Sequence, residues 1–445
     1  MKTEPLKTAP APQPGGPRTG PVPFDDALSG LLRHAAPPGA TEEIPTLEAA
    51  HRVLAQAVVS PLAVPEWDNS QMDGYAVRSS ELVAAGPDLK PAQLRVSQRI
   101  AAGQQGMRLE PGTVARIFTG AAVPAGADAV VMQEQAVPAG EGAEGGQLVQ
   151  FTHSPVPGEW IRRRGEDIES GATILQPGTR LTPQATGLAA SVGAATLKVF
   201  GRLRVACFFT GDELVMPGEP LKPGSIYNSN RFLLTGLLRR LGCEVLDLGI
   251  IGDSLEATRA ALRQAAAQSD LIVTSGGVSV GEEDHVKPAV EAEGELHLWQ
   301  IALKPGKPLA YGRVRRSGAG EAAPGGAGSA GFAHFIGLPG NPVSSFVTFL
   351  MFARPFILAL QGVSKVEPVR LRLVAGFDWP RPDRRREFLR VRVDAQTGLL
   401  ELFRNQGSAV LTSTVEADGL LDNPGGQPIR RGDVVTYLPF ADLLN

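Results

Sequence analysis

The sequence is poor in the residues that build metal clusters and disulfide frameworks. It contains two cysteines, Cys207 and Cys243, and both lie in apolar runs, where we expect buried and reduced thiols. The six histidines never fall at the short spacings of a zinc motif. A net charge of −3 shows no basic excess, which is the electrostatic signature of proteins that bind nucleic acid. The sequence therefore predicts neither a cysteine–histidine metal site nor a nucleic-acid partner.

Long apolar runs are also missing. No run approaches the roughly 20 apolar residues that a membrane span needs. Residues 1–22 are rich in proline and lack the apolar core of a signal peptide. We therefore expect a disordered leader over residues 1–22 and a cytoplasmic protein without a membrane partner.

Glycine and proline, in contrast, are abundant. The 445 residues include 52 glycines and 37 prolines, which predicts many turns and short strands. The hydrophobic and charged fractions, 43% and 20%, are ordinary for a globular protein. A chain of this length is expected to form about three domains, each with its own core.

The pattern of apolar residues divides the chain into parts. Within residues 23–200 we expect a mainly helical unit, with helices in FDDALSGLLRHA, in TLEAAHRVLAQAVVS from Thr46, and from Thr182. Short apolar pieces between glycines and prolines predict a β-rich domain inserted at about 60–165. Residues 201–360 alternate strands with helices, which predicts a parallel sheet covered on both faces, a three-layer α/β domain. One of these helices is expected to begin at Ser229 or Asn230, and another to have Ser254 as its N-cap. Residues 361–445 return to strands and predict a small β-barrel or sandwich.

The stretch from Asp270 to Lys287 carries the clearest functional signal. A short apolar run, typical of a buried strand, is followed by the turn Thr274-Ser275-Gly276-Gly277. Ser279 and three acids at 282–284 come next, at the start of a predicted helix. A glycine turn between a strand and a helix binds anions, and neighbouring carboxylates suit a hard divalent cation. The stretch therefore predicts a pocket for a phosphate and a metal ion.

Three further turns belong to the same predicted sheet: TGDE at 210–213, KPGKP at 304–308 and GLPGNP at 337–342. Ligands of such sheets bind at the carboxyl ends of the strands, so we expect these turns beside the glycine turn. In isolation a surface turn explains the acids of TGDE better, but beside the glycine turn they become candidate Mg²⁺ ligands. The lysines of KPGKP are either solvated or held by their prolines for an oxyanion.

Other charged segments also allow two interpretations. RPDRRREFLR, residues 381–390, is either an exposed strand edge or a source of positive charge for an anionic ligand. IRRRGEDI, residues 161–168, reads most simply as a solvated charge run. DNSQMDGY, residues 68–75, packs polar groups together without helical or strand periodicity, which is typical of a functional loop.

Seven stretches, in this order along the chain, resemble the motifs of the molybdopterin molybdenumtransferase (MoeA) family, to which the E domain of gephyrin-like proteins is also similar. They are DNSQMDGYAVR, RIFTGAAVPAGADAVVMQE, RRRGEDI, TGDELV, SGGVSVGEEDHVK, KPGKPLAYG and GLPGNPVSS. The match runs from about residue 25 to the C-terminus. The resemblance implies that the α/β domain binds molybdopterin and that the C-terminal domain is a β-barrel.

The resemblance also implies an activity, the last step of molybdenum cofactor synthesis. Adenylylated molybdopterin binds, molybdate is delivered to its dithiolene, and the phosphoanhydride is cleaved to release AMP, with Mg²⁺ or a similar cation as cofactor. Family members are elongated homodimers whose site lies between the α/β domain of one subunit and the inserted domain of the other. The adenylyltransferase and other cofactor-synthesis proteins are candidate further partners.

Site residues are implied motif by motif. The implied catalytic residues are Asp68, Thr119, Asp167, Glu213 and Asp284, and of these Glu213 and Asp284 are also the implied metal ligands. The implied substrate-binding residues are Ser275, Gly276, Gly277, Ser279, Lys304, Lys307, Pro339 and Pro342.

Two alternatives stand beside this interpretation. The α/β domain is also similar to molybdopterin adenylyltransferases, which lack the flanking domains, so the chain could catalyse adenylylation instead. A gephyrin-like scaffold protein would use the same fold for oligomerisation. The complete set of acidic residues favours an active transferase.

Overall fold

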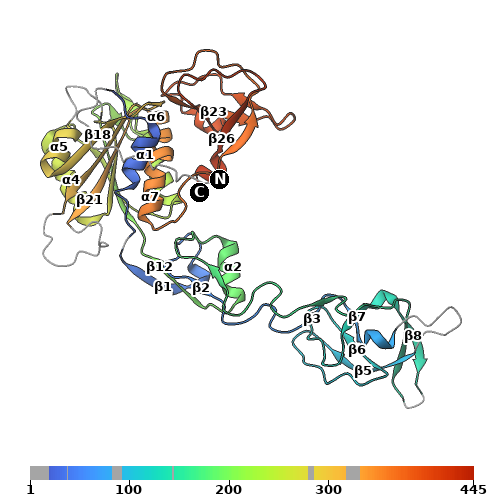
Figure 1. Ribbon diagram of the computed structural model, residues 1–445. Helices are drawn as coiled ribbons and strands as arrows, with labels where there is room; N and C mark the ends of the chain where they lie inside the picture. The colour runs from blue at the N-terminus through green and yellow to red at the C-terminus, as the bar shows by residue number, and fades with distance from the viewer. Residues whose placement is uncertain are drawn as a thin grey trace, which may run out of the picture.

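The computed structural model describes residues 20–37, 39–82, 93–142, 145–278, 285–316 and 331–444. The molecule is elongated (Figure 1). The α/β domain and the C-terminal sheet lie at one end, the inserted β-rich domain forms the other end, and a slender unit of paired strands connects them.

The first helix is confirmed and the second is wrong. Helix α1 spans Phe24–Leu32 and packs against the α/β domain, not against its neighbours in sequence. From Thr46 only a 3-10 turn forms, η1 (Thr46–Glu48). The N–H groups of His51 and Leu54 donate to carbonyls more than a hundred positions along the chain, those of Leu181 and Thr179. The apolar residues of this segment therefore belong to an extended backbone, which is hydrogen-bonded to residues 179–181.

The connecting unit is mostly built of strands, so the expectation of a mainly helical unit is wrong. β1 (Thr41–Pro45) pairs with β12 (Thr196–Phe200), and β2 (Val58–Val59) pairs with β11 (Thr173–Leu175). Helix α2 (Pro183–Ser191) begins where predicted, and the Thr182 hydroxyl accepts a hydrogen bond from the Ala185 N–H as its N-cap.

The inserted domain contains a six-stranded sheet of order β7-β4-β6-β5-β9-β8. Its strands are β4 (Gly74–Val77), β5 (Leu94–Ile100), β6 (Thr113–Ile117), β7 (Ala129–Met132), β8 (Ala136–Glu141) and β9 (Gln147–Phe151). The 3-10 turns η2 (Ser79–Glu81) and η3 (Gln133–Gln135) lie in its connections. β3 (Asn69–Ser70) and β10 (Ile161–Arg162) pair as a short ribbon where the domain joins the rest of the chain.

The α/β domain contains a six-stranded sheet of order β16-β13-β17-β21-β20-β18. Its strands are β13 (Arg204–Thr210), β16 (Glu244–Ile251), β17 (Leu271–Ser275), β18 (Gly294–Gln300), β20 (Pro308–Arg315) and β21 (Phe332–Leu338). The first four in the order are parallel, but β18, β20 and β21 pair antiparallel, so the sheet is mixed and not parallel as predicted. These three strands follow each other without an intervening described helix, and a parallel crossover needs a long connection, usually a helix.

Helices cover both faces of this sheet, which gives the predicted three layers. One layer consists of α4 (Leu255–Gln268) and α5 (Val286–Glu293), and the Ser254 hydroxyl caps α4 as predicted. The other layer consists of α1, α3 (Ser229–Arg240), α6 (Pro342–Thr348), the π-helical turn η4 (Phe349–Ala353) and α7 (Arg354–Leu360). The N-cap of α3 is Asn228, one position before the predicted start.

The last of these elements form one continuous helix over Pro342–Leu360, and it corrects the expectation that no apolar run approaches membrane-spanning length. It has 19 residues, and its most apolar window has a mean hydropathy of 1.8, which by length and composition would suffice to cross a membrane. However, 94% of its most apolar window is buried inside the structure. The helix is therefore a core helix of the α/β domain.

The C-terminal part forms a sheet of order β19-β23-β25-β26-β22, with β24 paired to β23. Its elements are β19 (Leu303–Lys304), β22 (Leu371–Val374), β23 (Arg386–Val393), β24 (Leu400–Leu402), β25 (Gly419–Asn423) and β26 (Val434–Pro439), with short helices α8 (Thr412–Glu416) and α9 (Phe440–Leu443). β19 comes from the KPGKP segment of the α/β domain and pairs Lys304 with Glu387. This pairing joins the two domains at one edge of the main sheet.

Candidate active-site cavity

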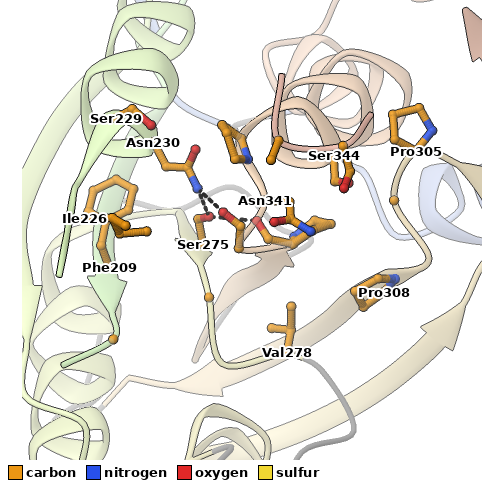
Figure 2. A pocket seen from close by; sticks show the side chains of 18 of the residues that line it. Phe209, Ile226, Ser229, Asn230, Ser275, Val278, Pro305, Pro308, Asn341 and Ser344 are labelled. Atoms are coloured by element: carbon orange, nitrogen blue, oxygen red, sulfur yellow. Dashed lines mark hydrogen bonds between the residues drawn. The ribbon is translucent and has the colours of Figure 1, made fainter. Parts of the chain in front are cut away.

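A cavity of about 1010 Å³ lies at the carboxyl ends of β13, β17 and β21. It is lined by all four predicted turns, including Glu213, Ser275, Gly276, Gly277, Lys304, Lys307, Pro339 and Pro342. Figure 2 shows Ile226, Ser229 and Asn230 on one side, Ser275 in the centre, and Pro305 and Pro308 on the opposite side. The structure thus brings together the predicted residues of the α/β domain that it describes.

The TGDE turn follows β13 directly. Gly211 has a φ of +143°, and a Cβ at this position would lie 2.7 Å from a carboxylate oxygen of Glu213. Glycine is therefore required for the Glu213 side chain to fold back along the turn. The hydroxyl of Thr210 is buried and has no hydrogen-bond partner within the described residues, although the residue lines the cavity. The turn supplies a carboxylate and an unused hydroxyl to the cavity.

Ser275 ties three segments together. Its hydroxyl donates to the Pro339 carbonyl (2.8 Å) and accepts from the Asn230 side-chain amide (2.8 Å). The same amide nitrogen donates to the Gly340 carbonyl (2.7 Å; Figure 2). The Ser275 hydroxyl therefore holds the ends of β17 and β21 and the start of α3 in register, and these internal bonds already occupy it.

Gly276 and Gly277 form the tightest part of the glycine turn. Their φ angles are +98° and +64°, in the left-handed region that glycine tolerates best. A Cβ on Gly276 would lie 2.6 Å from the Thr210 carbonyl oxygen, and one on Gly277 would lie 2.5 Å from a methyl group of Val286. Both positions exclude side chains, so the backbone itself faces the cavity, as a phosphate-binding turn requires.

The opposite end of the cavity is cationic. Arg385, from RPDRRREFLR, lines the cavity beside Lys304 and Lys307, which favours the interpretation that this segment lends positive charge. Lys304 is held by two ion pairs: its Nζ lies 3.2 Å from Glu387 Oε1 and 3.6 Å from Asp383 Oδ2. Lys307 is exposed and makes no ion pair within the described part of the chain.

Asp383 is held by Arg385 through two parallel N–H bonds, to Oδ1 (3.0 Å) and Oδ2 (2.9 Å). The Arg385 guanidinium, aided by its backbone N–H and by Lys304, holds the pKa of this carboxyl well below its usual range. Asp383 therefore stays ionised throughout the physiological range of pH.

Several lining residues were missed by sequence reasoning. They are Asn228, Asn230, Asp253, Ser344 and the segment 406–409. Asn230 was considered only as a helix start, and its second role depends on contacts 45 and 110 positions away. The segment 406–409 comes from the C-terminal domain, and no local motif marks it. Only the fold brings it to the cavity.

A divalent cation in this cavity would need oxygen ligands from the residues that line it. Within the described ranges no group of three or more His, Cys, Asp or Glu side chains could hold a metal ion. Asp284 and Ser279 lie outside the described residues, and so do the acids at 282–283. Mg²⁺ is commonly held by one or two carboxylates together with substrate phosphate oxygens. Glu213 and Asp253 on the cavity wall, with the unpartnered Thr210 hydroxyl, fit a site of that kind.

None of the three remaining predicted residues lines this cavity. Asp68 directly precedes β3 and Thr119 follows β6, and both strands lie at the opposite end of the molecule (Figure 1). Asp68 accepts from the Arg163 guanidinium (2.7 Å) and the Arg164 N–H (2.8 Å). Partial burial alone would raise the pKa of Asp68, but these two donors outweigh it and the pKa is lowered. IRRRGEDI is therefore not simply a solvated run, because its arginines fix Asp68.

Thr119 and Asp167 occupy two other surfaces of this region. Thr119 donates both its N–H and its hydroxyl to Asp73 Oδ1 (2.8 Å each). These bonds, the backbone one foremost, lower the pKa of Asp73. Asp167 lines a separate cavity of about 390 Å³ with Val64, Pro65, Arg162 and Glu166. One chain alone therefore does not unite these residues with Glu213 and the glycine turn.

Comparisons with known proteins cover nearly the whole chain. Three family models match in order: the MoeA N-terminal region (domain I and II) over residues 22–193, a probable molybdopterin binding domain over 206–359, and the MoeA C-terminal region (domain IV) over 372–440. The chain is 38% identical over 433 residues to a molybdopterin molybdenumtransferase of Haemophilus influenzae, covering 95% of this chain and 99% of the relative. It is 38% identical to molybdopterin molybdenumtransferase 2 of Mycobacterium tuberculosis over 86% of this chain and 90% of the relative.

The solved structures agree. The crystal structure of the molybdopterin biosynthesis moeA protein from Pyrococcus horikoshii OT3 superposes with a TM-score of 0.77 at 26% identity, covering 94% of this chain and 100% of that one. The identity, the coverage and the order of domains together show that the chain belongs to the MoeA family of molybdopterin molybdenumtransferases.

Proposed function

We propose that this chain inserts molybdenum into molybdopterin as the last step of cofactor biosynthesis, with adenylylated molybdopterin and molybdate as substrates and AMP as a product. The relatives are named for molybdenum transfer to molybdopterin. The observation that carries the finer assignment is the layout of one cavity of about 1010 Å³, which has an anion-binding glycine turn on its floor and a cationic cluster at one end. Such a cavity accommodates two anions at once.

Roles follow from this layout. The backbone at Gly276 and Gly277 receives a phosphate of the substrate, with Ser279 beyond it, and Pro339 and Pro342 shape the wall. Ser275 keeps this turn in register through its two hydrogen bonds.

The cationic end receives molybdate. Lys304, Lys307 and Arg385 present N–H donors to a tetrahedral dianion. The low pKa of Asp383 keeps the carboxylate that holds Arg385 ionised, so the guanidinium keeps its orientation. Molybdate is therefore bound in the same cavity as the phosphate groups.

Cleavage of the phosphoanhydride needs charge neutralisation. Glu213 and Asp284 would hold Mg²⁺, which when bound neutralises developing charge on the phosphate oxygens. Water supplies the oxygen that ends on phosphorus as the phosphoanhydride P–O bond breaks and AMP leaves. The cavity has no nucleophile–base pair among its described lining residues, so direct attack by water suits it better than a covalent intermediate.

We also propose that the active form is a cytoplasmic homodimer. None of Asp68, Thr119 and Asp167 lines the cavity of its own chain. The strands β3 and β6, next to Asp68 and Thr119, lie at the end of the elongated molecule opposite the α/β domain (Figure 1). A two-fold arrangement of two such chains would bring these residues of each chain to the cavity of the other. That arrangement explains why both sets are needed for one reaction.

Mixing two inactive variants tests the shared site. Glu213→Gln removes a carboxylate from the cavity, and Asp68→Asn removes one from the distal set. Each variant alone should release almost no AMP from adenylylated molybdopterin with molybdate and Mg²⁺. After mixed refolding, half of the dimers are heterodimers and each has one intact site, so about a quarter of the wild-type activity should return.

Three outcomes would contradict the proposal. A mixture that stays inactive, although heterodimers are detected by native mass spectrometry, would refute the shared site. Formation of adenylylated molybdopterin from ATP and molybdopterin, without AMP release from it, would identify an adenylyltransferase instead. AMP release that survives in both single variants would favour a scaffold role for these residues.

A further inference from the structure

At the cationic end of the cavity, two carboxylates hold two of the cations in place. Lys304 contacts both Glu387 and Asp383, and Arg385 is paired with Asp383. Glu387 is fully buried, whereas the Lys304 side chain is 38% exposed and the Arg385 side chain 32%. The Asp383 side chain is 25% exposed, but neither acid lines the cavity, whereas Lys304 and Arg385 do.

Each oxygen of these two carboxylates already accepts from the protein. Asp383 Oδ1 accepts from the Arg385 N–H and Nε, and Oδ2 accepts from Nη2. Glu387 Oε1 accepts from Lys304 Nζ (3.2 Å), and Oε2 accepts from Trp379 Nε1 (2.8 Å) and Asn423 Nδ2 (3.4 Å). These acids hold the cations in place, and because neither lines the cavity they present no acceptor at its wall to a ligand.

The consequence is chemical selectivity. An oxyanion without a proton, such as molybdate, tungstate or sulfate, accepts hydrogen bonds on every oxygen and suits a cluster of donors. Hydrogen phosphate keeps one O–H at neutral pH, and that group needs an acceptor or is left facing a cation. A polar group that is desolvated without its partner typically costs about 1–3 kcal/mol.

We propose that Asp383 and Glu387 are positioning residues that make this end of the cavity select unprotonated oxyanions over hydrogen phosphate. The inference deepens the proposed function and rests on its assignment of molybdate to Lys304, Lys307 and Arg385. It also separates the two anion sites of the cavity, since the glycine turn offers backbone N–H groups for phosphate while the cationic end rejects it.

Displacement of molybdate from the full-length protein tests the selectivity. The protein is dialysed against molybdate at pH 7.5, bound molybdenum is measured by mass spectrometry, and sulfate or phosphate is added as competitor. Because only displaced molybdate is counted, phosphate on the glycine turn does not contribute. Sulfate should displace molybdate at a concentration at least about tenfold below that of phosphate, which corresponds to one mismatched hydrogen bond.

Variants test the positioning role. Asp383→Asn puts an amide N–H₂ against the Arg385 guanidinium, and we expect molybdate to bind about tenfold more weakly, with KM for molybdate raised and kcat at saturation nearly unchanged. Glu387→Gln should act in the same direction through Lys304, and Asp383→Glu should restore part of the affinity.

Asp422→Asn is the matched control. Asp422 holds Arg386 and Arg370 in the same sheet, but it does not line the cavity. It should lower the melting temperature and leave the selectivity for molybdate unchanged.

Two results would overturn the inference alone, and a third would also overturn the proposed function. One is equal displacement by sulfate and phosphate from a wild-type protein that still releases AMP, which would leave the proposed function standing. The other is unchanged molybdate binding in Asp383→Asn. A wild-type chain that binds no molybdate would overturn both the inference and the function on which it rests.

Discussion

Protonation of His334 gives a stability prediction with a magnitude. His334 lies on β21 in the α/β domain and is only 5% exposed. Burial, together with the charges of Arg313, His34 and Arg316, lowers the pKa of its imidazole to about 4, although Asp270 acts in the opposite direction. Its Nδ1 lies 3.0 Å from the hydroxyl of Tyr311. The folded protein therefore keeps this ring neutral at a pH where an unfolded chain would protonate it.

The direction in which stability changes with pH follows from the number of protons that the folded and unfolded chains bind. Below the ordinary histidine pKa of about 6.5 the unfolded chain binds a proton that the folded chain rejects, so stability falls as the pH falls. The loss grows between pH 6.5 and the folded pKa of about 4 and is complete below it. Integrated between pH 7.5 and 5.0, it amounts to about 2 kcal/mol.

Hydrogen exchange of the β17 and β21 amides measures the free energy of opening of this domain at both pH values, after correction for the intrinsic exchange rate. The wild-type loss should exceed that of His334→Gln by about 2 kcal/mol. His153→Gln is the control, because His153 is paired with Glu159 in the inserted domain (2.7 Å). Equal losses in wild type and His334→Gln would refute the reasoning.

Three further predictions concern the site. Gly276→Ala places a Cβ 2.6 Å from the Thr210 carbonyl oxygen at a φ of +98°. We therefore expect about 1–3 kcal/mol of destabilisation and a raised KM for the adenylylated substrate. The control Gly112→Ala, at a φ of +73° with open space around it, should lower only the melting temperature. Glu213→Gln should reduce Mg²⁺-dependent AMP release by about a hundredfold or more without unfolding the protein, whereas Glu219→Gln on the same segment should not. Asp73→Asn weakens the acceptor that orients Thr119, so AMP release should fall about tenfold while the circular dichroism spectrum stays unchanged.

Local patterns predicted the site turn better than they predicted its surroundings. The strand–glycine–glycine signal at Ser275 and the helix cap at Ser254 are encoded within a few residues, and both appear as expected. The helix predicted from Thr46 fails because its backbone pairs with residues near 180, which no local pattern reveals. Asp383 and Glu387 lie in a charged run that is also typical of an exposed strand edge. They come close to Lys304 only because β23 pairs with β19 of another domain.

The docking of α1 has a consequence for how the protein is made. Phe24 packs on Phe352, with ring centroids 4.9 Å apart, and Asp25 is paired with Arg386, 361 positions further along the chain. At about 5–20 residues per second, a ribosome needs roughly 20 to 70 s to cover that distance. During this time the apolar face of α1 lacks the residues against which it packs. The inserted domain, whose sheet is complete by Phe151, can already fold. Helix α1 is therefore among the last described elements to pack into the α/β domain. During that interval the exposed apolar surface of the nascent domain needs protection from aggregation.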